Sequence, residues 1–144
     1  MTLGTFACIL GMRRQDGMVE DINELAGLAK NDLTLAFLLA MLFFSLAGIP
    51  PLAGFFAKFY VFLAAIEAEL YTLAIIGVLA SVIGAYYYLR IVKIIFFDEA
   101  AEPFKPMGRQ LKFVLVASGI FVLAFVMVPT YLVEAADAAA KTFF

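Results

Sequence analysis

The amino-acid sequence predicts an all-α integral membrane protein. We expect a polytopic set of transmembrane helices, including one broken helix over residues 33–66, together with a short amphipathic surface helix. Two observations predict this fold class. Hydrophobic residues make up 65% of the chain and charged residues 15%, with a mean hydropathy of +1.03, which lies outside the composition of soluble globular domains. The charges also gather in short polar segments that separate long apolar runs.

The first element, residues 1–12, is apolar and compatible with a helix. Twelve residues of helix span only about 18 Å, which is too short to cross a bilayer. A secretory signal peptide would carry positive charges before its apolar run, whereas Arg13 and Arg14 follow this one. We therefore expect residues 1–12 to be the end of a truncated transmembrane helix.

Residues 13–32 form a polar connector that contains a helical pattern. Asp21 is followed by Glu24 three residues later, and apolar residues recur at helical spacing. These apolar residues are Ile22, Leu25, Ala26 and Ala29. The spacing predicts a short amphipathic helix that lies flat on the membrane surface. Acidic residues outnumber basic ones here, which favours docking on protein over binding anionic lipid, and a solvated connector is the alternative.

The next segment, residues 33–66, contains a single charge and is too long for one straight span. As one helix it would measure about 51 Å, against a hydrocarbon core of about 30 Å. Pro50 and Pro51 lack N–H groups and disfavour helical geometry in the residue before each of them. Gly48 supplies a permissive backbone just ahead of them. The sequence therefore predicts two half-helices, residues 33–47 and 51–66.

Lys58 is the one charge in this segment. A helix break at membrane depth leaves carbonyl and N–H groups without partners, and these must face protein or water. Lys58 lies two turns into the second half, and its Cβ tilts back toward the break. An ammonium group there can meet the free carbonyls, so we predict a proton-transfer site at Lys58, with Gly48, Pro50 and Pro51 forming the break. In the alternative interpretation, Lys58 snorkels to the interface beyond the end of the second half-helix.

The second half of the chain predicts two further spans. Tyr71–Phe97 forms a long apolar helix, residues 98–110 form a loop, and residues 111–133 form the last span. Pro129 is expected to kink or end that span near the far surface.

Basic residues predict the orientation. They lie within residues 13–32 and in and around residues 98–110, whereas the turn at residues 67–69 has none and the C-terminal tail has only Lys141. By the positive-inside rule, residues 13–32 and 98–110 are cytoplasmic and the C-terminus is periplasmic.

Composition also excludes several classes of function. The chain has no histidine and a single cysteine, Cys8, which excludes the common metal constellations, a histidine-based catalytic triad and an intrachain disulfide. A net charge of −2 gives no footprint for nucleic acid. We expect no catalytic residue and no metal on this chain, and the lipid bilayer rather than nucleic acid as its environment.

Residues 45–62, Ser-Leu-Ala-Gly-Ile-Pro-Pro-Leu-Ala-Gly-Phe-Phe-Ala-Lys-Phe-Tyr-Val-Phe, resemble the broken twelfth transmembrane helix of an antiporter-like subunit of bacterial NADH:quinone oxidoreductase, respiratory complex I. Residues 1–6, 25–28 and 87–93 show the same resemblance. Phe59 after Lys58 favours the subunit N family, because subunit L usually has an acidic residue at that position and subunit M typically has a glutamate in place of the lysine.

The resemblance implies that residues 1–144 are the C-terminal portion of a fourteen-helix, proton-translocating subunit of the membrane arm. It implies that Lys58 passes protons toward the periplasmic side of the bacterial inner membrane. It also implies that the chain binds no redox cofactor, that other membrane-arm subunits are its partners, and that NADH and quinone are handled elsewhere in the complex. The family's charged groups on helices five, seven and eight are absent from this chain, so these residues line only the last part of a proton route.

Two other functions remain open at this point. Multisubunit cation/proton antiporters share the fold, and the chain then forms part of such an antiporter. Alternatively it is a structural membrane module whose broken helix only packs against a partner.

Overall fold

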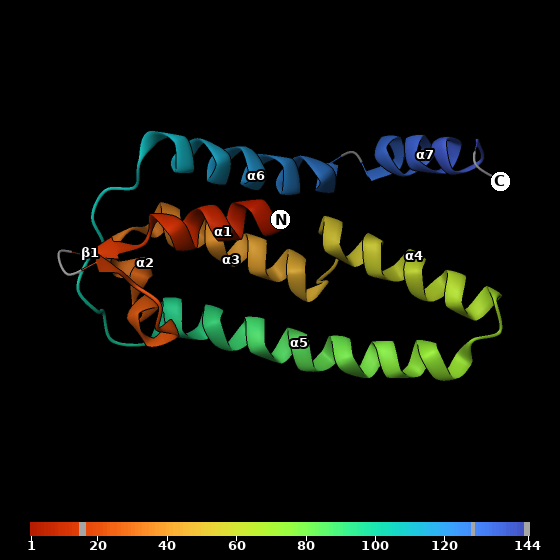
Figure 1. Ribbon diagram of the computed structural model, residues 1–144, viewed down its shortest axis with the longest axis horizontal. Coiled ribbons are helices and arrows are strands. Elements are labelled where there is room, and N and C mark those ends of the chain that lie inside the picture. The colour runs from red at the N-terminus through yellow and green to blue at the C-terminus, as the bar shows by residue number, and fades with distance from the viewer. Residues whose placement is uncertain (15–16, 128, 143–144) are drawn as a thin grey trace.

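The computed structural model describes residues 1–14, 17–127 and 129–142. Long helices run roughly parallel or antiparallel to one another, and the short elements gather at one end (Figure 1). The long helices are α1 (Thr2–Gly11), α3 (Leu33–Ala47), α4 (Ala53–Glu67), α5 (Tyr71–Phe97), α6 (Arg109–Met127) and α7 (Pro129–Ala140). The short elements are β1 (Arg13–Arg14), β2 (Gly17–Met18), the 3₁₀ helix η1 (Ile22–Leu25) and α2 (Leu28–Asn31). Both segments that the sequence predicts to be cytoplasmic lie at this end.

The broken helix is present as two successive helices, α3 and α4, beside the unbroken α5 (Figure 1). Each half has 15 residues, and α5 has 27. The bounds of α3 and α5 coincide with the predicted ones, whereas α4 begins two residues later than predicted and ends one residue later. The break therefore lies part-way along α5, which contacts both halves.

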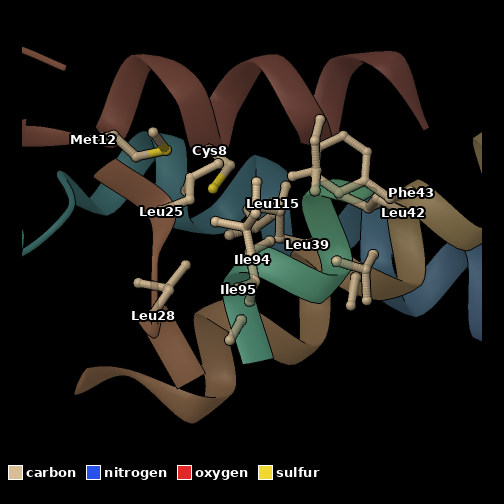
Figure 2. Packing of buried hydrophobic residues seen from close by; sticks show 14 of the residues in the cluster. Cys8, Met12, Leu25, Leu28, Leu39, Leu42, Phe43, Ile94, Ile95 and Leu115 are labelled. Carbon is tan, nitrogen blue, oxygen red and sulfur yellow. The ribbon is translucent and has the colours of Figure 1, made fainter. Parts of the chain in front are cut away.

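The buried core lies toward the end that carries the short elements. Leu39 and Leu42 of α3 pack there with Cys8 of α1, Ile95 of α5 and Leu115 of α6, and each of these side chains is almost fully buried (Figure 2). Farther along, most large apolar side chains of α4 and of the first half of α5 are exposed. Among the described helices, α5 and α6 are each long and apolar enough to cross a membrane.

The connector differs from the prediction of one amphipathic helix. It contains a two-stranded antiparallel pairing of β1 with β2, then η1 and α2 as two separate pieces. Gly27 separates them at a positive φ of 60°. Its N–H donates to the carbonyl of Ile94 at 3.0 Å, and the Ala26 carbonyl accepts from Ala101 N–H at 2.9 Å. These bonds to the end of α5 and the following loop replace the helical bonds that would have joined the two pieces.

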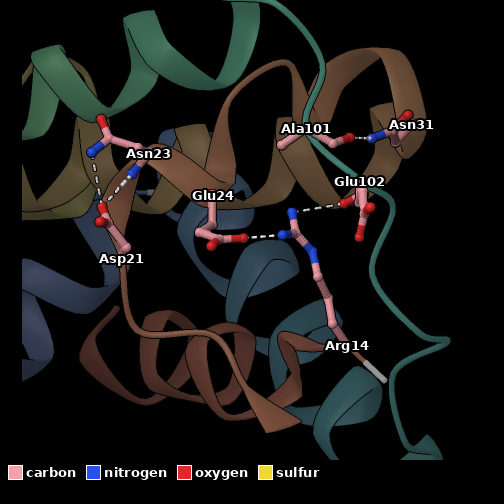
Figure 3. Close-up of polar contacts among 7 residues, drawn as sticks. All are labelled: Arg14, Asp21, Asn23, Glu24, Asn31, Ala101 and Glu102. Carbon is pink, nitrogen blue, oxygen red and sulfur yellow. Dashed lines mark hydrogen bonds and ion pairs between the residues drawn. The ribbon is translucent and has the colours of Figure 1, made fainter. Parts of the chain in front are cut away.

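Arg14 ties this connector to the loop after α5 (Figure 3). Its guanidinium forms an ion pair with Glu24 of η1 and donates to the Glu102 carbonyl at 2.9 Å. The guanidinium carbon also lies 5.3 Å from the centre of the Phe104 ring, a cation–π distance. The two polar segments that sequence analysis assigned to one side of the membrane are thus in direct contact.

The C-terminal part contains more helix than expected. α6 begins at Arg109, two residues before the predicted span, and ends at Met127. After residue 128, α7 begins at Pro129 and continues to Ala140. Proline is well suited to the first position of a helix, where no N–H is needed, and the alanines that follow favour helix. Pro129 therefore begins a helix at the position where the sequence predicted a kink or an end.

Candidate functional site

The candidate site lies where α3 ends. Gly48 adopts a left-handed conformation, with φ of 87°, and its N–H donates to the carbonyls of Phe44 and Ser45 at 3.1 Å. The N–H of Ile49 donates to the Phe44 carbonyl at 3.0 Å. This glycine-capped end supplies hydrogen-bond donors to the carbonyls of residues 44 and 45.

The double proline leaves the Ala47 carbonyl without its usual partners. In a continuing α-helix this carbonyl would accept from the N–H of residue 51, and in a 3₁₀ turn from that of residue 50. Both residues are prolines, Pro50 and Pro51, and have no N–H to donate. The same sequence that breaks the helix therefore creates an acceptor at its end.

The side chain of Lys58 donates a hydrogen bond to this acceptor. Its Nζ donates to the Ala47 carbonyl oxygen at 2.9 Å, and the side chain is partly buried. The lysine stem lies over Gly48, where a Cβ atom would come within 3.0 Å of Lys58 Cδ and 3.4 Å of Nζ. The side chain points back toward the break, as its helical direction predicts, and away from the far end of α4 where a snorkelling lysine would point. None of the ion pairs among the described residues includes Lys58.

A tight contact between the two half-helices sets the position of Lys58. Gly54, one turn before Lys58, lies so close to the end of α3 that a Cβ atom on it would be 1.7 Å from the Ser45 carbonyl oxygen. The N–H of Gly54 donates to Ser45 Oγ at 3.2 Å. Ser45 is fully buried, and its hydroxyl donates to Met1 Sδ. Ser45 thus satisfies one of the free N–H groups at the start of α4 and joins the two halves.

Phenylalanine side chains hold the start of α4 against its neighbours. The ring of Phe56 lies 5.4 Å from that of Phe125 on α6, centre to centre, and packs edge-on against Phe55. Such aromatic pairs are worth about 0.5–1.5 kcal/mol beyond the area they bury.

The structure therefore brings the four predicted site residues, Gly48, Pro50, Pro51 and Lys58, into one small region. Sequence reasoning predicted free carbonyls at the break and room for the lysine stem beside Gly54, but it missed that Ala47 supplies the acceptor and that Gly54 contacts Ser45. The Ala47 acceptor was encoded in the prolines three and four residues after it, whereas the contact of Gly54 with Ser45 depends on how the half-helices cross. Among the described residues, no three His, Cys, Asp or Glu side chains are grouped to hold a metal ion.

The family model described as NADH:quinone oxidoreductase/Mrp antiporter, transmembrane, matches residues 1–84, which include the whole of this site. The chain belongs to this family. NADH-quinone oxidoreductase subunit N of Parvibaculum lavamentivorans is 61% identical over 142 residues, which cover 98% of this chain and 29% of that protein. Subunit N 1 of Rhizobium meliloti is 59% identical and is matched by all of this chain over 30% of its own length.

A solved structure has the same fold. A chain of respiratory complex I from Thermus thermophilus with bound aureothin superimposes with a TM-score of 0.74 at 29% sequence identity. The match covers 88% of the present chain and 30% of the Thermus chain. The present chain spans about 30% of the length of the curated relatives it matches, and it is called this segment below. The break, Lys58 and the helices around them belong to an antiporter-like transmembrane domain.

Proposed function

We propose that this segment is part of the proton-translocating membrane arm of NADH:quinone oxidoreductase, and that Lys58 transfers protons there. The observation that carries the proposal is the 2.9 Å hydrogen bond from Lys58 Nζ to the Ala47 carbonyl, which the double proline has deprived of backbone donors. The relatives named subunit N, at 59–61% identity, support placement in this complex.

The contact suits a group that holds a proton and then releases it. A carbonyl accepts a hydrogen bond from the lysine nitrogen but cannot take its proton, so the Ala47 carbonyl positions Nζ without discharging it. An ammonium has three N–H groups, and two remain for water or for groups outside this segment. Proton release then goes to one of those partners.

The family resemblance implies transfer toward the periplasmic side, and the helix order supports it. α4 runs from the break to the turn after Glu67, the end opposite the connector of residues 13–32 (Figure 1). With the connector on the cytoplasmic side of the bacterial inner membrane, Lys58 acts late in the route, toward the periplasmic side, and the C-terminus is periplasmic. Earlier steps use residues of the full-length subunit outside this segment.

The proposed partners follow from the exposed surface. The apolar side chains on α4 and the first half of α5 suit contact with lipid and with other helices of the membrane arm. NADH and quinone are bound by other subunits, and this segment contributes no redox cofactor to the reaction.

Two substitutions in the full-length subunit, assembled in its complex, test the role of Lys58. Lys58→Met removes the ammonium, whereas Lys58→Arg keeps a positive charge and hydrogen-bond donors but does not release a proton in proteins. We expect both variants to assemble and both to lose proton translocation per quinone reduced. Lys93→Met is the matched control, since Lys93 is exposed and paired with Asp98 far from the break.

The outcomes distinguish proton transfer from packing. If Lys58 serves only to pack the break, Lys58→Met should fail to assemble whereas Lys58→Arg should pump normally. Normal pumping by both variants at normal assembly would refute the proposal.

The family description also includes Mrp antiporters, so a cation/proton antiporter subunit is the second candidate. It predicts sodium-dependent proton exchange in membranes that lack any NADH:quinone oxidoreductase activity. Vesicles of such membranes that contain the full-length subunit, assayed with a sodium gradient and without NADH, decide between the two.

A further inference from the structure

A cavity of about 400 Å³ opens between the start of α3, the start of α6 and the loop that precedes α6. The charged side chains lie at one end of the cavity, among apolar ones such as Phe104 and Met107, and the other end is apolar. Lys105 of the loop and Lys112 of the first turn of α6 line it near the helix starts, and Leu38 of α3 lines it farther along together with Leu115 and Val116 of α6. The cavity is distinct from the helix break and lies toward the opposite end of α3.

The two lysines leave the cavity positively charged. Both are exposed, and in the described part of the chain neither ammonium takes part in an ion pair or a side-chain hydrogen bond. Asp32 also lines the cavity, and its Oδ1 accepts from the N–H of Leu35 at 2.9 Å as the N-cap of α3. Two lysines against one aspartate leave a net charge of +1 for a ligand to neutralise.

The depth of the cavity defines the class of ligand. From Phe113 onward α6 is apolar, so Lys112 lies where the helix enters the hydrocarbon region and Leu115 lies inside it. Phe113, the next residue of α6, is 74% exposed and does not line the cavity. A ligand that fills the cavity must be anionic at the lysines and apolar one to two turns deeper. A free phosphate satisfies the first requirement only, whereas an anionic phospholipid satisfies both.

We propose that this cavity binds one anionic phospholipid. Its phosphodiester lies between Lys105 and Lys112, and one acyl chain starts in the cavity beside Leu38 and Val116 and continues in the surrounding bilayer. The proposal does not depend on proton transfer at Lys58, and the lipid holds the loop and the two helix starts together at the membrane surface.

Photo-crosslinking of the full-length subunit, reconstituted in vesicles with equal amounts of phosphatidylcholine and phosphatidylglycerol, tests the proposal. Val116→p-benzoylphenylalanine places a photoreactive group in the cavity wall. Phe113→p-benzoylphenylalanine places the same group on the exposed face as a control. A lysine at an anionic headgroup gives about a fivefold preference, so two lysines give about thirtyfold and the aspartate reduces this. We expect position 116 to capture phosphatidylglycerol over phosphatidylcholine by between about fivefold and thirtyfold, and position 113 to capture both equally.

Substitution of the lysines distinguishes a headgroup site from a simple apolar groove. Lys105→Gln combined with Lys112→Gln should return the capture ratio at position 116 to about one, while Lys93→Gln should leave it unchanged. Equal capture of both lipids at positions 116 and 113, capture of protein at 116, or an unchanged preference in the double variant each overturns the proposal. A site that takes only a free anion predicts no preference between the two lipids at position 116, and that result overturns the proposal as well.

Discussion

Gly54→Ala tests how closely the two half-helices must approach for Lys58 to reach its acceptor. The added Cβ would be 1.7 Å from the Ser45 carbonyl oxygen, whereas ordinary contact begins near 3.4 Å, so α4 must move away by about 1.7 Å. Such a shift breaks the 3.2 Å bond from Gly54 N–H to Ser45 Oγ. It also lengthens the 2.9 Å contact of Lys58 Nζ with the Ala47 carbonyl to beyond 4 Å if the lysine moves with its helix.

The expected loss is large for a single methyl group. Overpacking costs about 1–3 kcal/mol, and leaving a buried donor unpaired costs about 1–3 kcal/mol more. We take about 3 kcal/mol as the total, which lowers the population of the arrangement with Gly54 in contact with Ser45 by a factor of about 150. Proton translocation by the assembled complex, and the fraction of complex that survives heating in detergent, should both fall.

Gly84→Ala is the matched control for this substitution. Gly84 is also a helical glycine, on α5, but a Cβ there meets nothing within 4 Å. Alanine favours helix over glycine, so this variant should be neutral or slightly more stable. If Gly54→Ala survives heating and pumps as well as Gly84→Ala, the reasoning about the helix contact is wrong.

Three further predictions concern the break and the connector. Gly48→Ala must hold a left-handed φ of 87° and places a Cβ 3.0 Å from Lys58 Cδ. The stability of the assembled subunit should fall by about 1 kcal/mol or more, and proton translocation should fall with it. Replacing Pro50 and Pro51 together by alanine restores two backbone donors at the end of α3, and circular dichroism of the full-length variant should show added helix while proton translocation falls. Arg14→Gln removes an ion pair and the hydrogen bond to the Glu102 carbonyl, so the attachment of the loop should lose about 2 kcal/mol of stability. Limited proteolysis should then cut the loop faster. The same change at the exposed Arg13 should have little effect.

The helix bounds that could be predicted are those determined by local chemistry. α3 ends at Ala47 because Gly48 caps it and Pro50 prevents its continuation, and both signals are readable in the sequence. α5 begins at Tyr71 and ends at Phe97 because acidic residues flank a long, mostly apolar run that contains no proline. In these cases, neighbours along the chain determine the structure.

The connector could not be predicted in the same way, because distant residues determine its structure. The periodicity of residues 22–29 indicates one helix, yet Gly27 turns the chain so that its N–H reaches the carbonyl of Ile94. The backbone of Ala100 lies against Gly27, and a Cβ atom on residue 27 would be only 2.4 Å from Ala100 Cα. Only glycine therefore fits at this position. Tertiary packing here overrides the local pattern.

The candidate site lies between these two cases. The sequence predicted that Lys58 faces the break, since the direction of a helical side chain is local. The acceptor at Ala47 was also encoded locally, by the two prolines after it. The contact of Ser45 with Gly54 depends on the crossing of two helices, and the sequence contains no direct signal for it.

The contact of Gly54 with Ser45 makes α4 a lever whose fulcrum lies at its first turn. Lys58 is four residues from this fulcrum, about 6 Å along the axis, while Glu67 is about 20 Å away. A tilt of about 5° then displaces the far end of α4 by about 1.7 Å but moves the lysine by only about 0.5 Å. A displacement of the distal end of α4 therefore leaves the lysine nearly in place, whereas a displacement of its first turn separates Lys58 from the Ala47 carbonyl.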